Sequence, residues 1–318
     1  MTRALIVCPG RGSYGRDSLG SFKDLPPEAS AIVDACDAHR RASGTPTLRE
    51  LDALPSFSPS RHVAGEHASL LTFAASLADL ARLDVEVVAV TGNSMGWYTA
   101  LAASGALDLE SAIRLVDTMG SWQAGNVIGG QLMWPLTGED RKVDPRRIAE
   151  VDAAIADAHA AGHRAWWSIR LGSHAVIGAD EGGCSFLMAR LPSEQRGQRS
   201  YPARLPLHSA FHTPLLRETS ERALAELADL PFRAPRVPLI DGRGKIWRPH
   251  WADPAEMFEY TLGTQVVDTY DLNAAVKSAL WHVAPDAVIV LGPGDGLVRP
   301  VETIARAAGF GVPVRARA

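Results

Sequence analysis

The sequence predicts an α/β protein in which a large parallel-sheet domain is interrupted by a small inserted domain. Three short apolar runs, at residues 4–8, 85–90 and 287–291, each lead into a turn that contains glycine. Continuous apolar runs of this kind are typical of strands that are buried on both faces of a parallel sheet. Segments with helical spacing of apolar residues, such as 27–42 and 67–82, lie between them.

The middle of the chain has a different order of elements. We expect strands and helices there in the order βαββαβ, at residues 131–138, 144–160, 165–172, 173–180, 182–192 and 201–207. That order is the ferredoxin-like pattern, a small sheet with helices on one face. We therefore predict a ferredoxin-like subdomain at 128–205, inserted into a large α/β-hydrolase-like domain formed by residues 1–127 and 206–318.

Composition limits the classes of partner. The net charge of -4 and the isoelectric point near 6.2 argue against nucleic acid, because the chain has no overall basic field. No run reaches about 18 apolar residues, so we expect no membrane association and a cytoplasmic location. The three cysteines, Cys8, Cys36 and Cys184, form no CxxC motif. We interpret them as free buried thiols and expect no metal site.

A candidate nucleophile lies in the stretch VTGNSMGWY at residues 90–98. A Gly-x-Ser-x-Gly pattern between a strand and a helix places the serine, here Ser94, on a sharp turn with its Oγ exposed. The N–H groups at the start of the following helix can then stabilise an oxyanion. The β-branched strand before the pattern and the alanine-rich segment after it both favour this interpretation.

A nucleophilic serine also needs a general base. The chain has ten histidines. His212 follows an expected strand and leads into a helix through Pro214, which makes it the leading candidate. His282 is a second candidate, and the residues alone leave both open.

Four segments occur in an order that resembles a known family. They are CPGRGS (8–13), GNSMG (92–96), SAFHTPLL (209–216) and LGPGDGLV (291–298). They are similar to the FPGQGS loop, the GHSxG elbow, the histidine segment and the GPGxxL turn of the malonyl-CoA:acyl-carrier-protein transacylases and polyketide synthase acyltransferase domains. The resemblance covers nearly the whole chain, and the inserted ferredoxin-like subdomain agrees with it.

The resemblance implies a role for several residues. Ser94 is the implied nucleophile and His212 the base, with an oxyanion hole formed by the backbone N–H groups of Arg11 and Met95. The base is oriented by a main-chain carbonyl rather than by an acid, at a place that matches Thr261. No cofactor is implied, because an acyl-CoA or phosphopantetheinyl thioester is itself the substrate. The implied partner is an acyl carrier protein.

The sequence departs from the family at the acyl pocket. Met119 stands where malonyl-specific members carry an arginine, and a buried carboxylate without a cation is costly. Asn93 replaces the usual histidine, and Trp97 replaces a polar residue. We therefore expect a more apolar pocket, suited to an uncharged or bulky acyl group rather than plain malonyl. The expected pocket residues are Asn93, Trp97, Met119, Gln123, Arg170 and His174.

Two features of this region have alternative interpretations. The substituted residues can simply fill space between helices, or Arg170 can supply the missing cation from the opposite wall and retain a dicarboxylic substrate. Residues 196–217 carry arginines and no acidic residue, and Arg299 follows the GPG turn. These arginines form either a basic rim that steers an acidic carrier protein or an ordinary solvated surface.

Together these features predict an acyl carrier protein S-acyltransferase of polyketide or fatty-acid biosynthesis. The nearest alternative is a thioesterase or editing hydrolase on the same fold, in which water resolves the acyl-enzyme. An unrelated α/β-hydrolase with His282 as base and a non-catalytic docking module are further alternatives.

Overall fold

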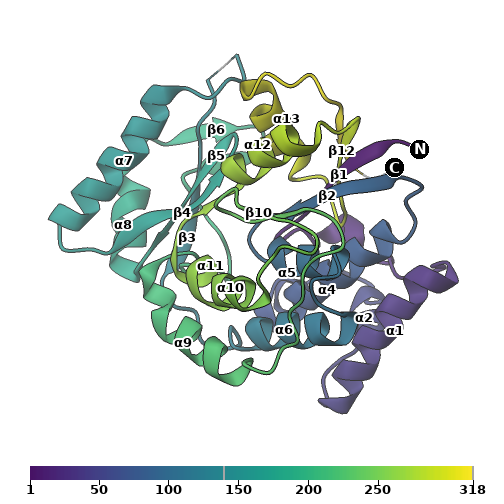
Figure 1. The fold of residues 1–318 in the computed structure, drawn as a ribbon. Helices are drawn as coiled ribbons and strands as arrows, with labels where there is room; N and C mark the ends of the chain where they lie inside the picture. The colour runs from purple at the N-terminus through teal and green to yellow at the C-terminus, as the bar shows by residue number, and fades with distance from the viewer. Residues whose placement is uncertain (139, 317–318) are drawn as a thin grey trace.

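A six-stranded sheet forms the centre of the protein (Figure 1), for which a computed structural model describes residues 1–138 and 140–316. Neighbouring strands are parallel except at β10. The order across the sheet is β10 (Ile246–Trp247), β9 (Leu239–Ile240), β2 (Glu86–Gly92), β1 (Arg3–Cys8), β12 (Ala287–Val290) and β13 (Val314–Ala316).

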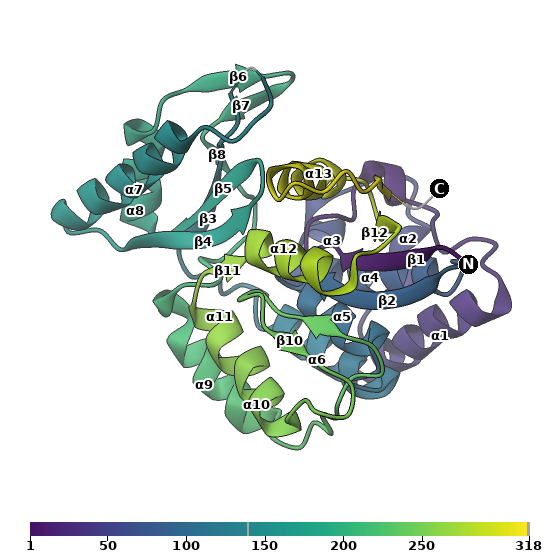
Figure 2. The same cartoon turned by 45° about the horizontal axis from the view of Figure 1, so that its top comes forward.

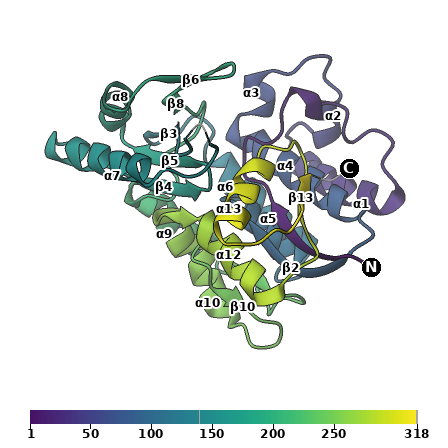
Figure 3. The same ribbon diagram turned by 90° about the horizontal axis from the view of Figure 1, so that it is seen from above.

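Side chains of β1 alternate between two cores, as expected of a strand that is covered on both faces. Ala4 and Ile6 belong to the core beneath one set of helices, and Leu5 and Val7 belong to the other. The first set is α1 (Pro27–Ala42), α4 (Gly65–Leu80), α5 (Gly96–Ala103) and α6 (Leu109–Ser121), and the second is α12 (Leu272–Val283) and α13 (Val298–Ala307). In Figure 1, α12 and α13 lie above the strands β1 and β2, and α4, α5 and α6 lie below them; Figure 3 is the view from above.

A second sheet lies to one side of the first (Figure 2). Its order is β11 (Tyr270–Asp271), β4 (Ala165–Leu171), β5 (His174–Ala179), β3 (Gly130–Pro135) and β8 (Ala203–Arg204). Helices α7 (Pro145–Ala160) and α8 (Glu181–Arg190) share its separate core. The elements from β3 to β8 follow the predicted βαββαβ order, and the α/β fold class is confirmed.

Details of this region differ from the prediction. A hairpin of β6 (Glu194–Arg196) and β7 (Arg199–Tyr201) precedes β8, so the last expected strand is reduced to two residues. β11 comes from beyond residue 205 and pairs in parallel with β4, at Tyr270 opposite Ile169. The small sheet thus includes a strand from outside residues 128–205. The boundaries 128 and 205 of the ferredoxin-like subdomain stay a prediction.

Short helices complete the described chain. They are η1 (Arg16–Ser18), α2 (Leu48–Asp52), α3 (Pro59–His62), η2 (Pro214–Leu216), α9 (Arg217–Glu226), α10 (Pro254–Glu259), the π-helical turn η3 (Tyr260–Thr264) and α11 (Gln265–Val267). The three cysteines are free and buried, as predicted. Within residues 1–138 and 140–316, no helix has both the length and the apolar character needed to cross a bilayer.

Candidate active site

Ser94 lies on a tight turn between β2 and α5, in the left-handed region at φ 56°. Few residues other than glycine adopt this conformation, and strain of this kind is common at functional sites. The flanking glycines allow the chain to double back. A Cβ on Gly92 would lie 2.2 Å from the Gly96 carbonyl oxygen, and a Cβ on Gly96 would lie 2.2 Å from the Cys8 carbonyl oxygen. The Gly-x-Ser-x-Gly pattern is therefore a steric requirement of this turn.

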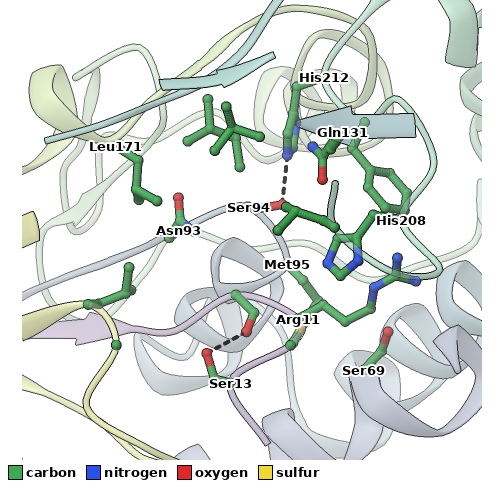
Figure 4. A pocket seen from close by; sticks show the side chains of 18 of the residues that line it. Arg11, Ser13, Ser69, Asn93, Ser94, Met95, Gln131, Leu171, His208 and His212 are labelled. Carbon is green, nitrogen blue, oxygen red and sulfur yellow. Dashed lines mark hydrogen bonds between the residues drawn. The ribbon is translucent and has the colours of Figure 1, made fainter. Parts of the chain in front are cut away.

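His212 faces Ser94 across this turn (Figure 4), with its Nε2 2.7 Å from the serine Oγ. Its Nδ1 lies 2.6 Å from the carbonyl oxygen of Gln265. A carbonyl only accepts hydrogen bonds, so Nδ1 carries the proton and Nε2 is free to accept from the serine. Burial lowers the pKa of His212 to about 4, which keeps the ring neutral near pH 7. The pair has the geometry of a serine and its general base.

The carbonyl that orients His212 belongs to Gln265, and the expectation that it belongs to Thr261 is wrong. Thr261 was expected from the resemblance alone. In the structure it lies within the π-helical turn Tyr260–Thr264, and Gln265 is the first residue after that turn. The Thr261 side chain is committed elsewhere. Its hydroxyl donates to the Met257 carbonyl at 2.7 Å and accepts from the Trp97 indole at 2.9 Å.

Gln265 also contacts the nucleophile turn. Its Nε2 donates to the Ser94 carbonyl at 3.2 Å, and its Oε1 accepts from the Tyr98 hydroxyl at 3.4 Å. The adjacent Val266 carbonyl accepts from the His212 backbone N–H at 3.1 Å. One short segment thus positions both Ser94 and His212. Sequence reasoning missed Gln265, because the group that orients His212 is a backbone carbonyl and the type of the residue gives no sign of it.

A cavity of about 550 Å³ opens at Ser94 and His212. Three of the predicted pocket residues, Asn93, Met119 and Gln123, lie on its wall. The small sheet supplies part of the opposite wall, which sequence reasoning did not identify: Gln131, Met133, Ile169, Leu171 and Val176. His282 lies exposed at the end of α12 and does not line the cavity.

Trp97 does not line the cavity, contrary to the sequence prediction. It is fully buried in the main core, with its ring edge-to-face with Tyr260 at 5.2 Å between centroids. Its indole N–H donates to Thr261. Trp97 follows Gly96 directly at the start of α5, and its side chain packs into the core rather than toward the cavity.

Arg170 and His174 also lie outside the cavity wall, which corrects two further expectations. Ile169 and Leu171 face the cavity from β4, and strand alternation turns Arg170 to the other face. Its guanidinium carbon lies 4.4 Å from the centroid of the Trp167 ring. The ring of His174 contacts the Ser173 hydroxyl at 2.9 Å.

Two backbone N–H groups beside Ser94 are available to an oxyanion. Arg11 and Met95 both line the cavity, and their backbone N–H groups donate to no atom of the described residues. The Ser13 hydroxyl donates to the Gly10 carbonyl at 2.8 Å and holds the loop that carries Arg11. In the same described part of the chain, no cluster of three or more His, Cys, Asp or Glu side chains is arranged to hold a metal ion.

Comparison with protein-family models gives no match. Over 230 residues, 72% of this chain, the sequence is 28% identical to erythronolide synthase EryA3 of Saccharopolyspora erythraea. It is 31% identical over 170 residues, 52% of this chain, to the polyketide biosynthesis protein ThaF of Burkholderia thailandensis. The matched regions span only 7% and 13% of those two proteins.

Solved structures match over nearly the whole chain. An acyl-carrier-protein S-malonyltransferase from Burkholderia pseudomallei superposes with a TM-score of 0.78 at 20% identity, covering 99% of this chain and 96% of that one. The acyltransferase domain from module 8 of the salinomycin polyketide synthase gives 0.78 at 19% identity, covering 99% and 70%. The chain therefore has the fold that the malonyl-CoA:acyl-carrier-protein transacylases share with polyketide synthase acyltransferase domains, as its four motifs had indicated.

Proposed function

We propose that this protein is an acyltransferase that moves an acyl group between thioesters through an acyl-enzyme on Ser94. The observation that carries the proposal is the 2.7 Å contact between Ser94 Oγ and a neutral His212 Nε2 inside a cavity. A serine at this position of an acyltransferase fold, next to a base whose tautomer is fixed, is arranged for nucleophilic catalysis.

The proposed reaction has two matched halves. Ser94 Oγ attacks the carbonyl carbon of the thioester while His212 Nε2 takes its proton, and the backbone N–H groups of Arg11 and Met95 stabilise the oxyanion. The C–S bond then breaks, and the departing thiolate receives the proton from His212. In the second half, the thiol of a carrier protein gives its proton to His212 and attacks the ester. The ester C–O bond then breaks, Ser94 Oγ takes the proton from His212, and the acyl group leaves as a new thioester.

The substrate is a phosphopantetheinyl or CoA thioester, and the acyl group is bound differently from malonate in the family that the sequence resembles. Met119 lines the cavity where that family carries its carboxylate-binding arginine. Val116 and Leu216 line the same cavity and add apolar surface. Because these side chains offer no charge to a carboxylate, we propose that the enzyme is not specific for plain malonyl.

The proposed partner is an acidic carrier protein that docks at the cavity rim. Arg199 is exposed and lines the cavity. Burial is the largest cause that lowers the pKa of His174 to about 4, and the charges of Arg196, Arg299 and Arg199 lower it further. The three arginines therefore lie close enough to act together. Arg196 and Arg204 each pair with a glutamate, which leaves Arg199 and Arg299 as the proposed contacts.

Intact-mass spectrometry tests the proposed function. After exposure to a panel of acyl-pantetheine and acyl-CoA thioesters, we expect the wild-type chain to gain the mass of one acyl group. Ser94→Ala should gain none, and His212→Ala should acylate about 100-fold to 10,000-fold more slowly. Failure of every thioester to acylate Ser94 would reject the proposal.

A second step separates transfer from the competing hydrolase. The acylated enzyme is mixed with holo acyl carrier protein, and both the carrier-bound acyl group and the free acid are measured. Transfer to the carrier supports the proposal, whereas free acid formed at the same rate with and without carrier identifies a thioesterase. Arg146→Gln is a surface control for this step, because the Arg146 side chain is 91% exposed and forms an ion pair with Asp144.

A further inference from the structure

A side chain that the mechanism above does not use stands inside the cavity. Arg11 follows β1 in the loop that supplies the proposed oxyanion N–H, and its side chain also lines the cavity. In Figure 4 it lies on the same side of Ser94 as Ser69 and His208. The family that the sequence resembles usually carries glutamine at this position, so the cation is a departure from the family's pattern.

The Arg11 guanidinium is poorly satisfied by the protein. Nη2 donates to the Leu207 carbonyl at 2.8 Å, and the guanidinium carbon lies 4.7 Å from the centroid of the Phe211 ring. Nε is buried without a hydrogen-bond partner, and Nη1 makes no hydrogen bond to any described residue. No carboxylate of the described chain pairs with it. A guanidinium has five N–H donors, so most of its capacity is unused.

The charge persists despite this burial. Burial lowers the pKa of Arg11 to about 10, which still leaves the side chain cationic near pH 7. The Arg11 side chain is half-buried, its Nε lacks a partner and no carboxylate of the described chain neutralises it, so an anionic ligand in the cavity would offset the cost of burying the charge. Such a group therefore indicates where a ligand carries negative charge.

The cation lies against the same wall as Met119. A Cβ on Gly65, the first residue of α4, would lie 2.7 Å from Arg11 Nη1, 2.5 Å from Gln123 Cβ and 2.9 Å from the Gly120 carbonyl oxygen. The guanidinium thus sits where the start of α4 meets the end of α6. The positive end of the α4 dipole adds to its attraction for an anion.

We propose that Arg11 binds the carboxylate of a carboxyacyl group carried on Ser94, so that the substrate is the thioester of a dicarboxylic acid. This inference rests on the proposed function and replaces the uncharged acyl group expected from Met119 alone. The cation is supplied by the loop after β1 instead of by α6. One guanidinium fork matches one carboxylate, and the apolar side chains of Val116 and Met119 line the cavity around the intervening chain.

Competition between charged acyl groups and their neutral isosteres tests this inference. Malonyl- and succinyl-pantetheine are compared with isovaleryl- and isocaproyl-pantetheine, which have the same shapes without the charge. Rates of Ser94 acylation are followed by intact mass. We expect at least one carboxyacyl group to react about 10-fold or more faster than its isostere, as one charge-assisted contact allows.

Variants of Arg11 then locate the contact. Arg11→Gln should lower the ratio of the acylation rates with the carboxyacyl group and with its neutral isostere about 10-fold to 100-fold, because only the carboxylate loses a charged partner. Arg11→Lys should restore part of the preference. Arg170→Gln, which removes a charge that does not line the cavity, is the matched control.

The outcomes are distinguishable. A wild-type preference for neutral groups, or a carboxyacyl preference that survives Arg11→Gln, overturns the inference while the acyl-enzyme still stands. An equal loss with both classes of thioester shows that Arg11 supports the fold or the oxyanion and also rejects it. Absence of any acylation of Ser94 removes the proposed function itself.

Discussion

His212 Nδ1 lies 2.6 Å from the main-chain carbonyl oxygen of Gln265, and this contact takes the place of the acid in a serine–histidine–acid triad. A carbonyl fixes the tautomer of the ring as an aspartate does, but it carries no formal charge to stabilise the imidazolium. Burial therefore has a larger effect on the pKa of His212 than the hydrogen bond to Gln265, and lowers that pKa to about 4. The base form of the histidine extends into mildly acidic solution.

This contact predicts the pH dependence of acylation. The reaction requires neutral His212, and a lowered pKa keeps that form present as the pH falls. We expect the rate of Ser94 acylation to stay level from pH 8 to about pH 5 and to fall only as the pH approaches about 4. Rapid-quench acylation across this range is the measurement. A midpoint near 6.5, the ordinary histidine value, would contradict the assignment.

A second prediction concerns stability in acid. Burial is the largest cause that lowers the pKa of His174, His208 and His212, each to about 4, whereas an unfolded histidine titrates near 6.5. Between these values the unfolded chain binds more protons than the folded chain. The free energy of unfolding should therefore decrease as the pH falls from about 6.5 toward 4.

Urea titrations at a series of pH values measure this decrease. His208→Asn should flatten the slope, because it removes one of the three groups. A free energy of unfolding that is constant between pH 6.5 and 4.5 would show that these rings are not buried as neutral groups. The same titrations identify the pH range in which the acylation rates report on folded enzyme.

Trp97 supplies a third prediction, since it belongs to the core and not to the acyl pocket. Trp97→Phe removes the indole donor to Thr261 and leaves a small void, which should cost about 1–3 kcal/mol of unfolding free energy. The relative rates with different acyl thioesters should not change. Met119→Ala, on the cavity wall, should change those relative rates instead. Altered selectivity in Trp97→Phe would place the indole in the pocket after all.

A fourth prediction concerns the turn that carries the nucleophile. Gly96→Ala places a Cβ 2.2 Å from the Cys8 carbonyl oxygen, so β1 or the start of α5 must shift. A displacement of Ser94 by even 1 Å is sufficient to slow catalysis about 100-fold. We expect slower acylation and a lower melting temperature. Gly311→Ala, which meets no atom within 4 Å, should match the wild type in both measurements.

The central strands were predictable, because a strand that is buried on both faces of a sheet appears in the sequence as a continuous apolar run. The run at residues 4–8 became β1, and 85–90 became most of β2. The β6–β7 hairpin was missed because its strands are three residues each and only Tyr201 among them is buried, so they carry no apolar alternation. β11 was missed for a related reason. Its two residues become a strand only by pairing with β4.

The site was predictable where a sequence motif fixes the backbone. It was not predictable where the direction of a side chain or of a carbonyl group decides which residues come into contact. Ser94 and His212 were expected together, and the structure brings them to 2.7 Å. Gln265 was missed because the resemblance pointed to the place near Thr261, and the type of a residue gives no sign of what its backbone carbonyl accepts. The Arg11 side chain was overlooked because position 11 was considered only for its backbone. The burial of its Nε without a hydrogen-bond partner is a property of the folded molecule.

The two sheets contribute to the cavity in different ways, and this has a consequence for the choice of acyl group. Gln131 and Met133 on β3 and Ile169 on β4 line the cavity, yet none of them hydrogen-bonds to Ser94 or His212 in the part of the chain described. Gln131 is nevertheless linked to the backbone beside His212, because it donates to Ser168, which donates to the Phe211 carbonyl. Variation at Met133 and Ile169 is therefore expected to change the preference for an acyl group without removing a hydrogen bond of the Ser94–His212 pair.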